Sequence, residues 1–211
     1  MKNLKDSLKI LAFSDVHGDQ STLAKLVRQA ETENVDLVVI GGDFSSRSAI
    51  DMAPPNLVGP FLGIGKEVLA IHGNNETELS VKMLEDVYGI KSLHGYYKIV
   101  GDVGIFGCGG APHIGPFTTK EEEIFTLLSR AHEKIKHTKR KVMVTHAHPS
   151  GTVMEQLTTI FPGSDAVRKA IDEFKPDVVV CGHVHEAEGM EEMIGKTKVI
   201  NVAKSGKVFI V

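Results

Sequence analysis

The 211-residue sequence contains no tryptophan, only two cysteines and no long apolar segment. Cys108 and Cys181 each end an apolar run, which predicts buried reduced thiols and argues against a disulfide framework or a cysteine-based zinc site. The longest apolar runs, such as 35–40 and 178–181, are far below the roughly 18 residues needed to cross a bilayer. A membrane-spanning protein is therefore not expected.

The sequence also lacks a large excess of charge of either sign. It has 24 basic and 27 acidic residues, and its formal net charge is −3. This balance provides no general attraction for nucleic acid or an anionic membrane, so nucleic acid is expected only as a nucleotide-type substrate. Residues 1–9 lack the apolar core and small-residue cleavage site of a secretion signal, which predicts a cytoplasmic protein. The 42% of apolar residues suffices for one buried core, so residues 1–211 are predicted to form a single domain.

Hydrophobic patterning predicts alternating strands and helices in most of the chain. Apolar residues at helical spacing predict helices over 23–30, 124–135 and 167–174, and Asp19 or Ser21 is positioned to cap the first. The first helix joins two predicted strands into a βαβ unit. Five short apolar segments bounded by turn or polar residues predict buried strands: 8–13, 35–40, 67–71, 141–145 and 177–181.

Short glycine-containing links join the remaining strand-like runs, and hairpins are expected there. One predicted hairpin pairs 96–100 with 103–108, and the other pairs 199–202 with 208–211. Two segments rich in glycine and proline, 41–66 and 109–118, are predicted to be loops. The fold class is therefore α/β with two sheets.

Side chains of metal-ligand type follow every one of the five predicted strands. Because binding sites in parallel α/β sheets form outside the carboxyl ends of strands, these clusters are expected to meet in space. Only oxygen and imidazole donors occur, which suits manganese, iron or zinc. The clusters are Asp15-Val16-His17, Gly41-Gly42-Asp43, Gly73-Asn74-Asn75-Glu76, His146-Ala147-His148 and Gly182-His183-Val184-His185.

Each cluster alone has an ordinary structural explanation. An Asp-x-His after a strand fits a turn with a helix cap, and Asn74-Asn75 suits left-handed turn geometry. The His-x-His pairs at 146–148 and 183–185 are a stronger signal, because residues two apart in an extended segment point to the same side. The occurrence of all five clusters in order, each at a strand end, favours a shared metal site.

In its Asp-x-His, Gly-Asp, Gly-Asn, His and Gly-His-x-His blocks the sequence resembles the calcineurin-like metallophosphoesterase superfamily over essentially its whole length. It looks closest to the small, uncapped bacterial and archaeal phosphoesterases of that superfamily. The resemblance implies a two-sheet α/β/β/α sandwich. It also implies a ligand set, in which one metal is held by Asp15, His17 and His185, the other by Asn74, His146 and His183, and both by a bridging Asp43.

This ligand set implies two divalent transition-metal ions, with manganese favoured and iron, zinc or nickel as alternatives. The expected reaction is hydrolysis of a small phosphomonoester or phosphodiester. Two cations clamp the attacking and leaving oxygens, and a bridging water yields hydroxide near neutral pH without a dedicated base. The alternative is a non-catalytic protein-interaction module that keeps the metal cage as a scaffold. The match at all seven ligand positions favours an enzyme, and the oligomeric state stays open.

The sequence departs from the family pattern at Asn75, where the family usually has a histidine that protonates the leaving oxygen. An asparagine cannot act as this acid. Three explanations remain open: the substrate has a good leaving group, another group such as His148, His72 or a metal-bound water donates the proton, or turnover has been lost.

Arg47 lies four residues after Asp43, where some branches of the family place an arginine that grips the substrate phosphate. The guanidinium fork suits phosphate oxygens. Ser46 replaces the acidic residue that usually precedes this arginine, which leaves a solvent-facing loop residue as the alternative. The candidate catalytic residues are therefore Asn75, His148 and Arg47.

Overall fold

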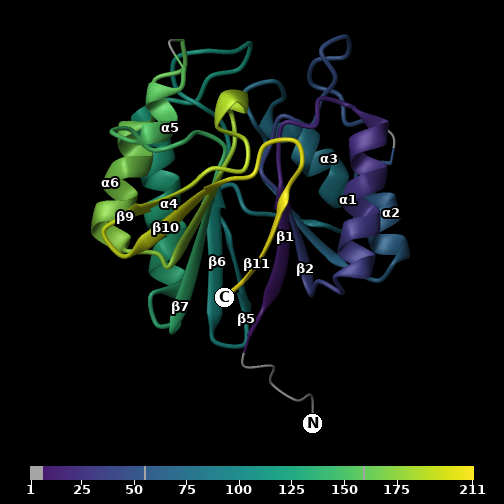
Figure 1. The fold of residues 1–211 in the computed structure, drawn as a ribbon, viewed down its shortest axis with the longest axis horizontal. Helices are drawn as coiled ribbons and strands as arrows, with labels where there is room; N and C mark the ends of the chain where they lie inside the picture. The colour runs from purple at the N-terminus through teal and green to yellow at the C-terminus, as the bar shows by residue number, and fades with distance from the viewer. Residues whose placement is uncertain (1–6, 55, 159) are drawn as a thin grey trace.

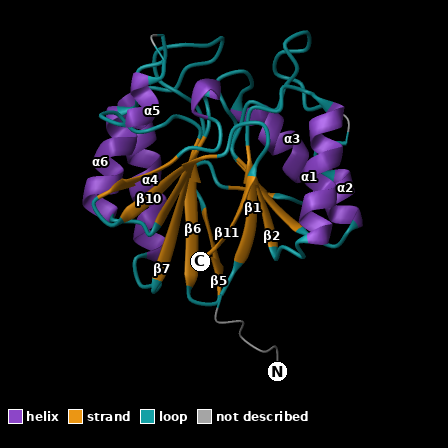
Figure 2. Ribbon diagram, viewed as in Figure 1, coloured by secondary structure: helices purple, strands orange, loops and turns teal. Residues whose placement is uncertain are grey.

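The computed structural model describes residues 7–54, 56–158 and 160–211. Two β-sheets lie face to face, and helices flank the pair on both sides (Figure 1). Coloured by secondary structure, the same view shows the strands in the middle and the helices outside them (Figure 2). These four layers confirm the predicted α/β/β/α sandwich.

The first sheet has the strand order β11-β1-β2-β3-β4, with β1 to β4 parallel and β11 antiparallel to β1. All four residues of β2 are buried, as expected for a parallel strand covered on both faces. The strands are β1 (Lys9–Phe13), β2 (Leu37–Ile40), β3 (Glu67–Ala70), β4 (Lys91–Ser92) and β11 (Lys207–Ile210). The helices beside this sheet are α1 (Gln20–Thr32), α2 (Gly59–Gly63) and α3 (Glu78–Tyr88).

The second sheet has the order β5-β6-β7-β8-β10-β9. Its four central strands run parallel, and β5 and β9 are antiparallel edge strands. The strands are β5 (Tyr97–Val100), β6 (Val103–Cys108), β7 (Arg140–Thr145), β8 (Val178–Cys181), β9 (Glu191–Ile194) and β10 (Thr197–Asn201). The helices on this side are α4 (Glu121–Ile135), α5 (Val153–Gln156) and α6 (Asp165–Phe174), and a 3₁₀ turn, η1 (His185–Ala187), follows β8.

Three apolar clusters fill the spaces between the four layers. The alternation of side chains along β1 shows how they are separated, because successive residues of a strand point to opposite faces. Leu11 and Phe13 belong to the cluster under the helices of the first sheet, whereas Ile10 and Ala12 belong to the cluster between the sheets. The third cluster lies between the second sheet and helices α4 and α6.

The predicted strands and helices are confirmed, with small shifts at their ends. Helix α1 is capped by Asp19, whose carboxylate accepts hydrogen bonds from the amides of Ser21 at 2.9 Å and Thr22 at 3.2 Å. The hairpin of β5 and β6 is also as predicted. Both cysteines are buried free thiols, as expected.

The predicted pairing of 199–202 with 208–211 is wrong. Strand β10 lies between β8 and β9, so neither of its edges is open to β11. The chain instead crosses to the first sheet, where β11 pairs with the exposed edge of β1. A short glycine-containing link permits a hairpin or a change of sheet, and the pattern along the chain does not distinguish them.

Sequence patterning also missed several elements. Helix α2 lies inside the segment 41–66 that was expected to be a loop, and helix α3 and strand β9 were not predicted. In α3 the apolar residues Leu79, Met83 and Val87 are exposed, so apolar side chains on two faces hide the helical period. Among the residues described, no helix is both long and apolar enough to traverse a bilayer.

Candidate metal centre

Five loops bring the predicted ligands together. They follow β1, β2, β3, β7 and β8, whose carboxyl ends point to the top of the molecule in Figure 1. The first three belong to one sheet and the last two to the other. The site therefore lies where the ends of the two sheets meet.

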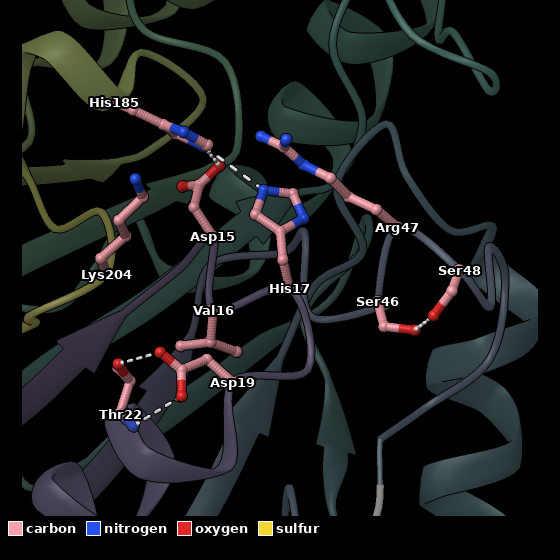
Figure 3. Close-up of a pocket in the computed structure, with 10 residues that line it drawn as sticks. All are labelled: Asp15, Val16, His17, Asp19, Thr22, Ser46, Arg47, Ser48, His185 and Lys204. Atoms are coloured by element: carbon pink, nitrogen blue, oxygen red, sulfur yellow. Dashed lines mark hydrogen bonds and ion pairs between the residues drawn. The ribbon is translucent and has the colours of Figure 1, made fainter.

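Asp15, His17 and His185 form the first group. Their ligand atoms all lie within 4.8 Å of one another. The Nε2 of His185 is 3.2 Å from Oδ1 of Asp15 and 3.3 Å from Nε2 of His17 (Figure 3). One carboxylate and two imidazoles at these distances are suited to a transition-metal ion.

Asp43, His146 and His183 form the second group, again with ligand atoms within 4.8 Å of one another. Asn74 joins them, since its Oδ1 is 2.9 Å from Nε2 of His146. Asp43 connects the two groups: its Oδ1 lies 3.4 Å from Nε2 of His146, and its Oδ2 lies 3.9 Å from Nε2 of His17. The structure thus brings together all seven residues that the sequence pointed to.

The surroundings of His146 show that a cation fits the second group. Its Nδ1 donates a hydrogen bond to the carbonyl oxygen of Gly41 at 2.9 Å, so Nε2 of the neutral ring carries a lone pair. That lone pair faces the side-chain oxygens of Asn74 and Asp43. Three acceptors converge on one space, and a proton or a metal cation relieves their repulsion. A hydrogen bond from the second ring nitrogen to a carbonyl is the usual support of a metal-binding histidine.

The titration of these groups also favours a cation. Burial alone raises the pKa of Asp15, but hydrogen bonds and charges of His185 and His146 outweigh it and hold that pKa below its usual range. Asp43 likewise has a lowered pKa, because His146 outweighs burial. Against the effect of burial, these carboxylates raise the pKa of His146 to about 10. Burial and the charge of His146 lower the pKa of His183 to about 3, which leaves its ring neutral and able to bind a metal.

Four of the seven residues have left-handed backbone conformations. The φ angles are 56° at Asp15, 44° at His17, 48° at Asp43 and 69° at His183. A non-glycine residue in this region costs roughly 1 kcal/mol or more, and such residues concentrate at functional sites. Each of these residues lies just past the end of β1, β2 or β8, where the left-handed conformation ends the extended strand. At His183 this conformation also breaks the alternation expected for an extended segment, and His183 and His185 enter different groups.

Two glycines allow the loops to approach this closely, a requirement that the sequence pattern did not reveal. A Cβ on Gly73 would lie 2.0 Å from Oδ1 of Asp43, and one on Gly182 would lie 2.4 Å from Oδ2 of Asp15. The signal in the sequence for this requirement is a glycine directly before a ligand residue in two separate clusters.

Glu76 is a further residue of the site whose role the sequence did not reveal. Its buried carboxylate accepts hydrogen bonds from the amide of Gly73 at 2.7 Å and from the amide of Ser45 at 3.0 Å. Burial and the charge of Asp43 raise its pKa to about 7. Glu76 therefore ties the loop after β3 to the loop after β2, next to Asn74 and Asp43.

The three candidate catalytic residues have different surroundings. Asn75 is half-buried, and its side-chain amide donates to the carbonyl of Ser45 at 3.2 Å. His148 is fully buried, neither ring nitrogen has a hydrogen-bond partner among the described residues, and burial lowers its pKa to about 4. Arg47 is exposed beside the first group (Figure 3). Of the three, Arg47 has the freedom to reach a ligand.

Two neighbouring cavities, with three lining residues in common, open onto the centre. The larger, about 480 Å³, lies over the first group, and the smaller, about 280 Å³, lies over the second. His17, Arg47 and His185 line both. His148 and Asn75 line neither. A small ligand can therefore contact both groups and Arg47 at once.

A model of calcineurin-like phosphoesterases matches residues 8–187, a span that includes all seven candidate ligands. The chain belongs to the calcineurin-like phosphoesterase family. Membership in this family, together with the two groups of metal-ligand residues, supports a metal-dependent phosphoesterase activity in general.

The chain is also similar to individual proteins. Protein MJ1162 of Methanocaldococcus jannaschii is 28% identical over 203 residues, covering 92% of this chain and 87% of the relative. The crystal structure of TT1561 of Thermus thermophilus has a TM-score of 0.73 at 17% identity, covering 94% of this chain and 90% of that one. A dimetal phosphatase from Danio rerio has a TM-score of 0.59 at 13% identity, covering 92% and 86%. The two structural likenesses show the shared fold.

Proposed function

We propose that this calcineurin-like phosphoesterase hydrolyses a small phosphomonoester or phosphodiester with two divalent transition-metal ions. The observation that carries the proposal is the position of Asp43, whose two carboxylate oxygens face His146 in one group and His17 in the other. A shared carboxylate keeps two cations close, as a binuclear hydrolase requires. The similarity in fold to a dimetal phosphatase supports the same assignment.

The protein's own residues would hold and orient the ions and the substrate. Bound cations would supply Lewis-acid polarisation of the phosphoester and a nucleophile near neutral pH. The carbonyl of Gly41 holds the ring of His146 with Nε2 toward the centre. The backbone amide of Asn75 donates to Oδ1 of Asp43 at 2.9 Å, which fixes the shared carboxylate. These contacts organise the site before a ligand arrives.

Arg47 would bind the substrate phosphate. It lines both cavities and lies beside the first group, so its guanidinium reaches the space above the centre (Figure 3). Guanidinium and phosphate form paired, charge-assisted hydrogen bonds. Asn75 offers no acidic proton, and His148 is buried and lines neither cavity, which favours substrates with good leaving groups.

Manganese is the proposed metal, on the basis of oxygen and imidazole donors without a thiolate. A cytoplasmic location stays a prediction, and residues 1–6 on which it partly rests lie outside the described residues.

Metal content and phosphoesterase activity test the proposal together. Protein loaded with manganese and then desalted should retain about two ions per chain by elemental analysis. Asp43→Ala should lower the content of both sites, whereas His185→Ala should weaken chiefly one, because only Asp43 is shared. Hydrolysis of p-nitrophenyl phosphate and bis-p-nitrophenyl phosphate should depend on the added metal.

A maximal content of one ion, or equal losses in the two variants, would contradict the shared carboxylate. Two bound ions without hydrolysis of any phosphomonoester, phosphodiester or cyclic nucleotide would instead support the protein-interaction module.

A further inference from the structure

The larger cavity extends beyond the space that a single phosphate on the metal centre would fill. Only His17, Arg47 and His185 are shared with the smaller cavity. The rest of the larger cavity continues past Asp15 toward the start of α1 and the turn between β10 and β11. Its volume of about 480 Å³ falls in the range of pockets for small organic molecules.

Lys204 forms the wall of this cavity opposite Arg47. Figure 3 shows the ammonium group of Lys204 on one side of Asp15 and His185, and the guanidinium of Arg47 on the other. The main chain fixes the position of this lysine, because its amide donates to the carbonyl of Ser14 at 2.8 Å. Lys204 is therefore anchored next to the loop that carries the first metal-ligand group.

The backbone of Lys204 has a strained conformation, and no interaction of its side chain accounts for that strain. Its φ angle is 53°, in the region that glycine or asparagine adopts most readily. Among the described residues its ammonium group makes no ion pair or hydrogen bond. A lysine here thus contributes nothing evident to the fold and places a free positive charge at the cavity.

The charges of the two cavities differ. The smaller cavity has Glu186 and the ring of Phe161 in its wall, whereas Lys204 lines only the larger one. Asp19 also lines the larger cavity and keeps its negative charge, but its carboxylate is held at the start of α1 by the amides of Ser21 and Thr22 and by the hydroxyl of Thr22. The part of the larger cavity next to Lys204 is therefore the place suited to additional negative charge.

The two cationic side chains have different positions relative to the metal centre. Arg47 lines both cavities and can reach a phosphate at the centre, whereas Lys204 lines only the larger cavity. A phosphate that Lys204 binds would therefore lie beside the one at the metal centre.

We propose that Lys204 forms a subsite for a second phosphate group, beside the phosphate that Arg47 would contact at the metal centre, so that the preferred substrate carries two phosphates close together. The inference rests on the proposed function, since one phosphate must occupy the metal centre. An organic portion of the substrate would then lie toward Phe161 in the smaller cavity.

Calorimetric titration of manganese-loaded protein with inorganic pyrophosphate and with orthophosphate tests the subsite without turnover. Wild-type protein should bind pyrophosphate at least about tenfold more tightly than orthophosphate, as expected for a charge-assisted contact. Lys204→Asn should remove most of that preference, and Lys204→Arg should restore it. Pyrophosphate binds free manganese equally in every titration. The comparison among variants therefore isolates the contribution of the side chain at position 204.

Lys196→Asn is the matched control, because it removes one exposed lysine from the turn between β9 and β10, away from both cavities. It should keep the wild-type preference. Lys204→Asn should also keep or raise Tm, because asparagine tolerates the left-handed conformation. A residue that only supported the fold would instead lower Tm and weaken both ligands equally.

The proposed subsite would be overturned if wild-type protein bound the two anions with equal affinity. It would also be overturned if Lys204→Asn lost affinity for pyrophosphate and orthophosphate equally. If bis-p-nitrophenyl phosphate is still hydrolysed in that case, the proposed function stands. If the protein neither retains metal nor hydrolyses any ester, both inferences fail.

Discussion

Asn75 is the residue at which the family pattern and the chemistry disagree. Without a protonating side chain, the leaving oxygen departs with negative charge, so kcat/KM should depend steeply on leaving-group basicity. In Asn75→His an imidazole beside the leaving oxygen should assist alkyl esters most and make the dependence less steep. The measurement is kcat/KM for both proteins over a graded series of aryl and alkyl phosphate esters.

Asn75→Gln is the control for this comparison, because it keeps an amide without adding an acid and should retain the steep dependence. The backbone bond from residue 75 to Asp43 does not involve the side chain and is preserved in both variants. A shallow dependence already present in the wild type would show that another acid protonates the leaving group.

His94 makes stability depend on pH outside the metal centre. Its Nδ1 accepts a hydrogen bond from the amide of Gly109 at 3.1 Å, and burial, followed by the charges of His72 and Arg130, lowers its pKa to about 4. The unfolded chain takes up a proton near pH 6.5, before the folded protein does. The stabilisation is therefore present above about pH 6.5 and is lost as the pH falls toward 4, by about 2 kcal/mol between pH 7.5 and pH 5.

Urea unfolding of metal-free protein at several pH values measures this effect. His94→Gln should lose stability at neutral pH, and its difference from wild type should shrink as the pH falls. His137→Gln, at an exposed position after α4, should follow the wild type at every pH. A constant difference between His94→Gln and wild type would argue against a buried neutral histidine.

At the scale of elements, the loops after β2 and β3 touch through Gly73. A Cβ at this position would collide with Oδ1 of Asp43 at 2.0 Å and with its backbone nitrogen at 2.4 Å. Gly73→Ala should therefore lower the free energy of unfolding by about 1–3 kcal/mol and displace the shared carboxylate. Urea unfolding and elemental analysis should record the loss of stability and of both metals together.

Gly63→Ala provides the control, in a helix beside the same sheet. Gly63 ends helix α2, and no atom lies within 4 Å of the Cβ it would gain. This change should leave metal content unaltered and stabilise slightly, by up to about 1 kcal/mol. Normal metal content in Gly73→Ala would show that the loops can separate without cost to the centre.

For the whole molecule, the metal centre joins the two sheets. Asp15, Asp43 and Asn74 extend from the first sheet, and His146 and His183 from the second. Metal that binds only the folded protein should raise its free energy of unfolding by about 2.7 kcal/mol at a free concentration of 100 times Kd. Thermal unfolding with manganese and then with excess EDTA should show the rise in Tm and its reversal.

Asp43→Ala is the variant to compare in that experiment, since manganese should raise its Tm much less than it raises the Tm of wild type. A wild-type Tm that is independent of metal would contradict the proposed link between the sheets.

The sequence by itself determined the features that depend on neighbouring residues. Strands such as β1 and β2 are recognisable in the sequence as continuous apolar runs, because parallel strands are covered on both faces. The polar residues behind those runs predicted a common edge, because parallel strands end on the same side. Helix α3 escaped prediction because Leu79, Met83 and Val87 remain exposed on its outer face.

The tertiary structure alone decided which of several similar residues or strands takes part in the site or in a given sheet. His146 and His148 follow the same strand, two residues apart, yet only His146 meets Asp43, and His148 is buried with its ring stacked on that of His183. Strand β11 joined the first sheet because β8 and β9 already occupy both edges of β10. Lys204 became part of a cavity because the crossing between the sheets places it beside Ser14. These outcomes depend on contacts between residues far apart in the chain, which no local pattern encodes.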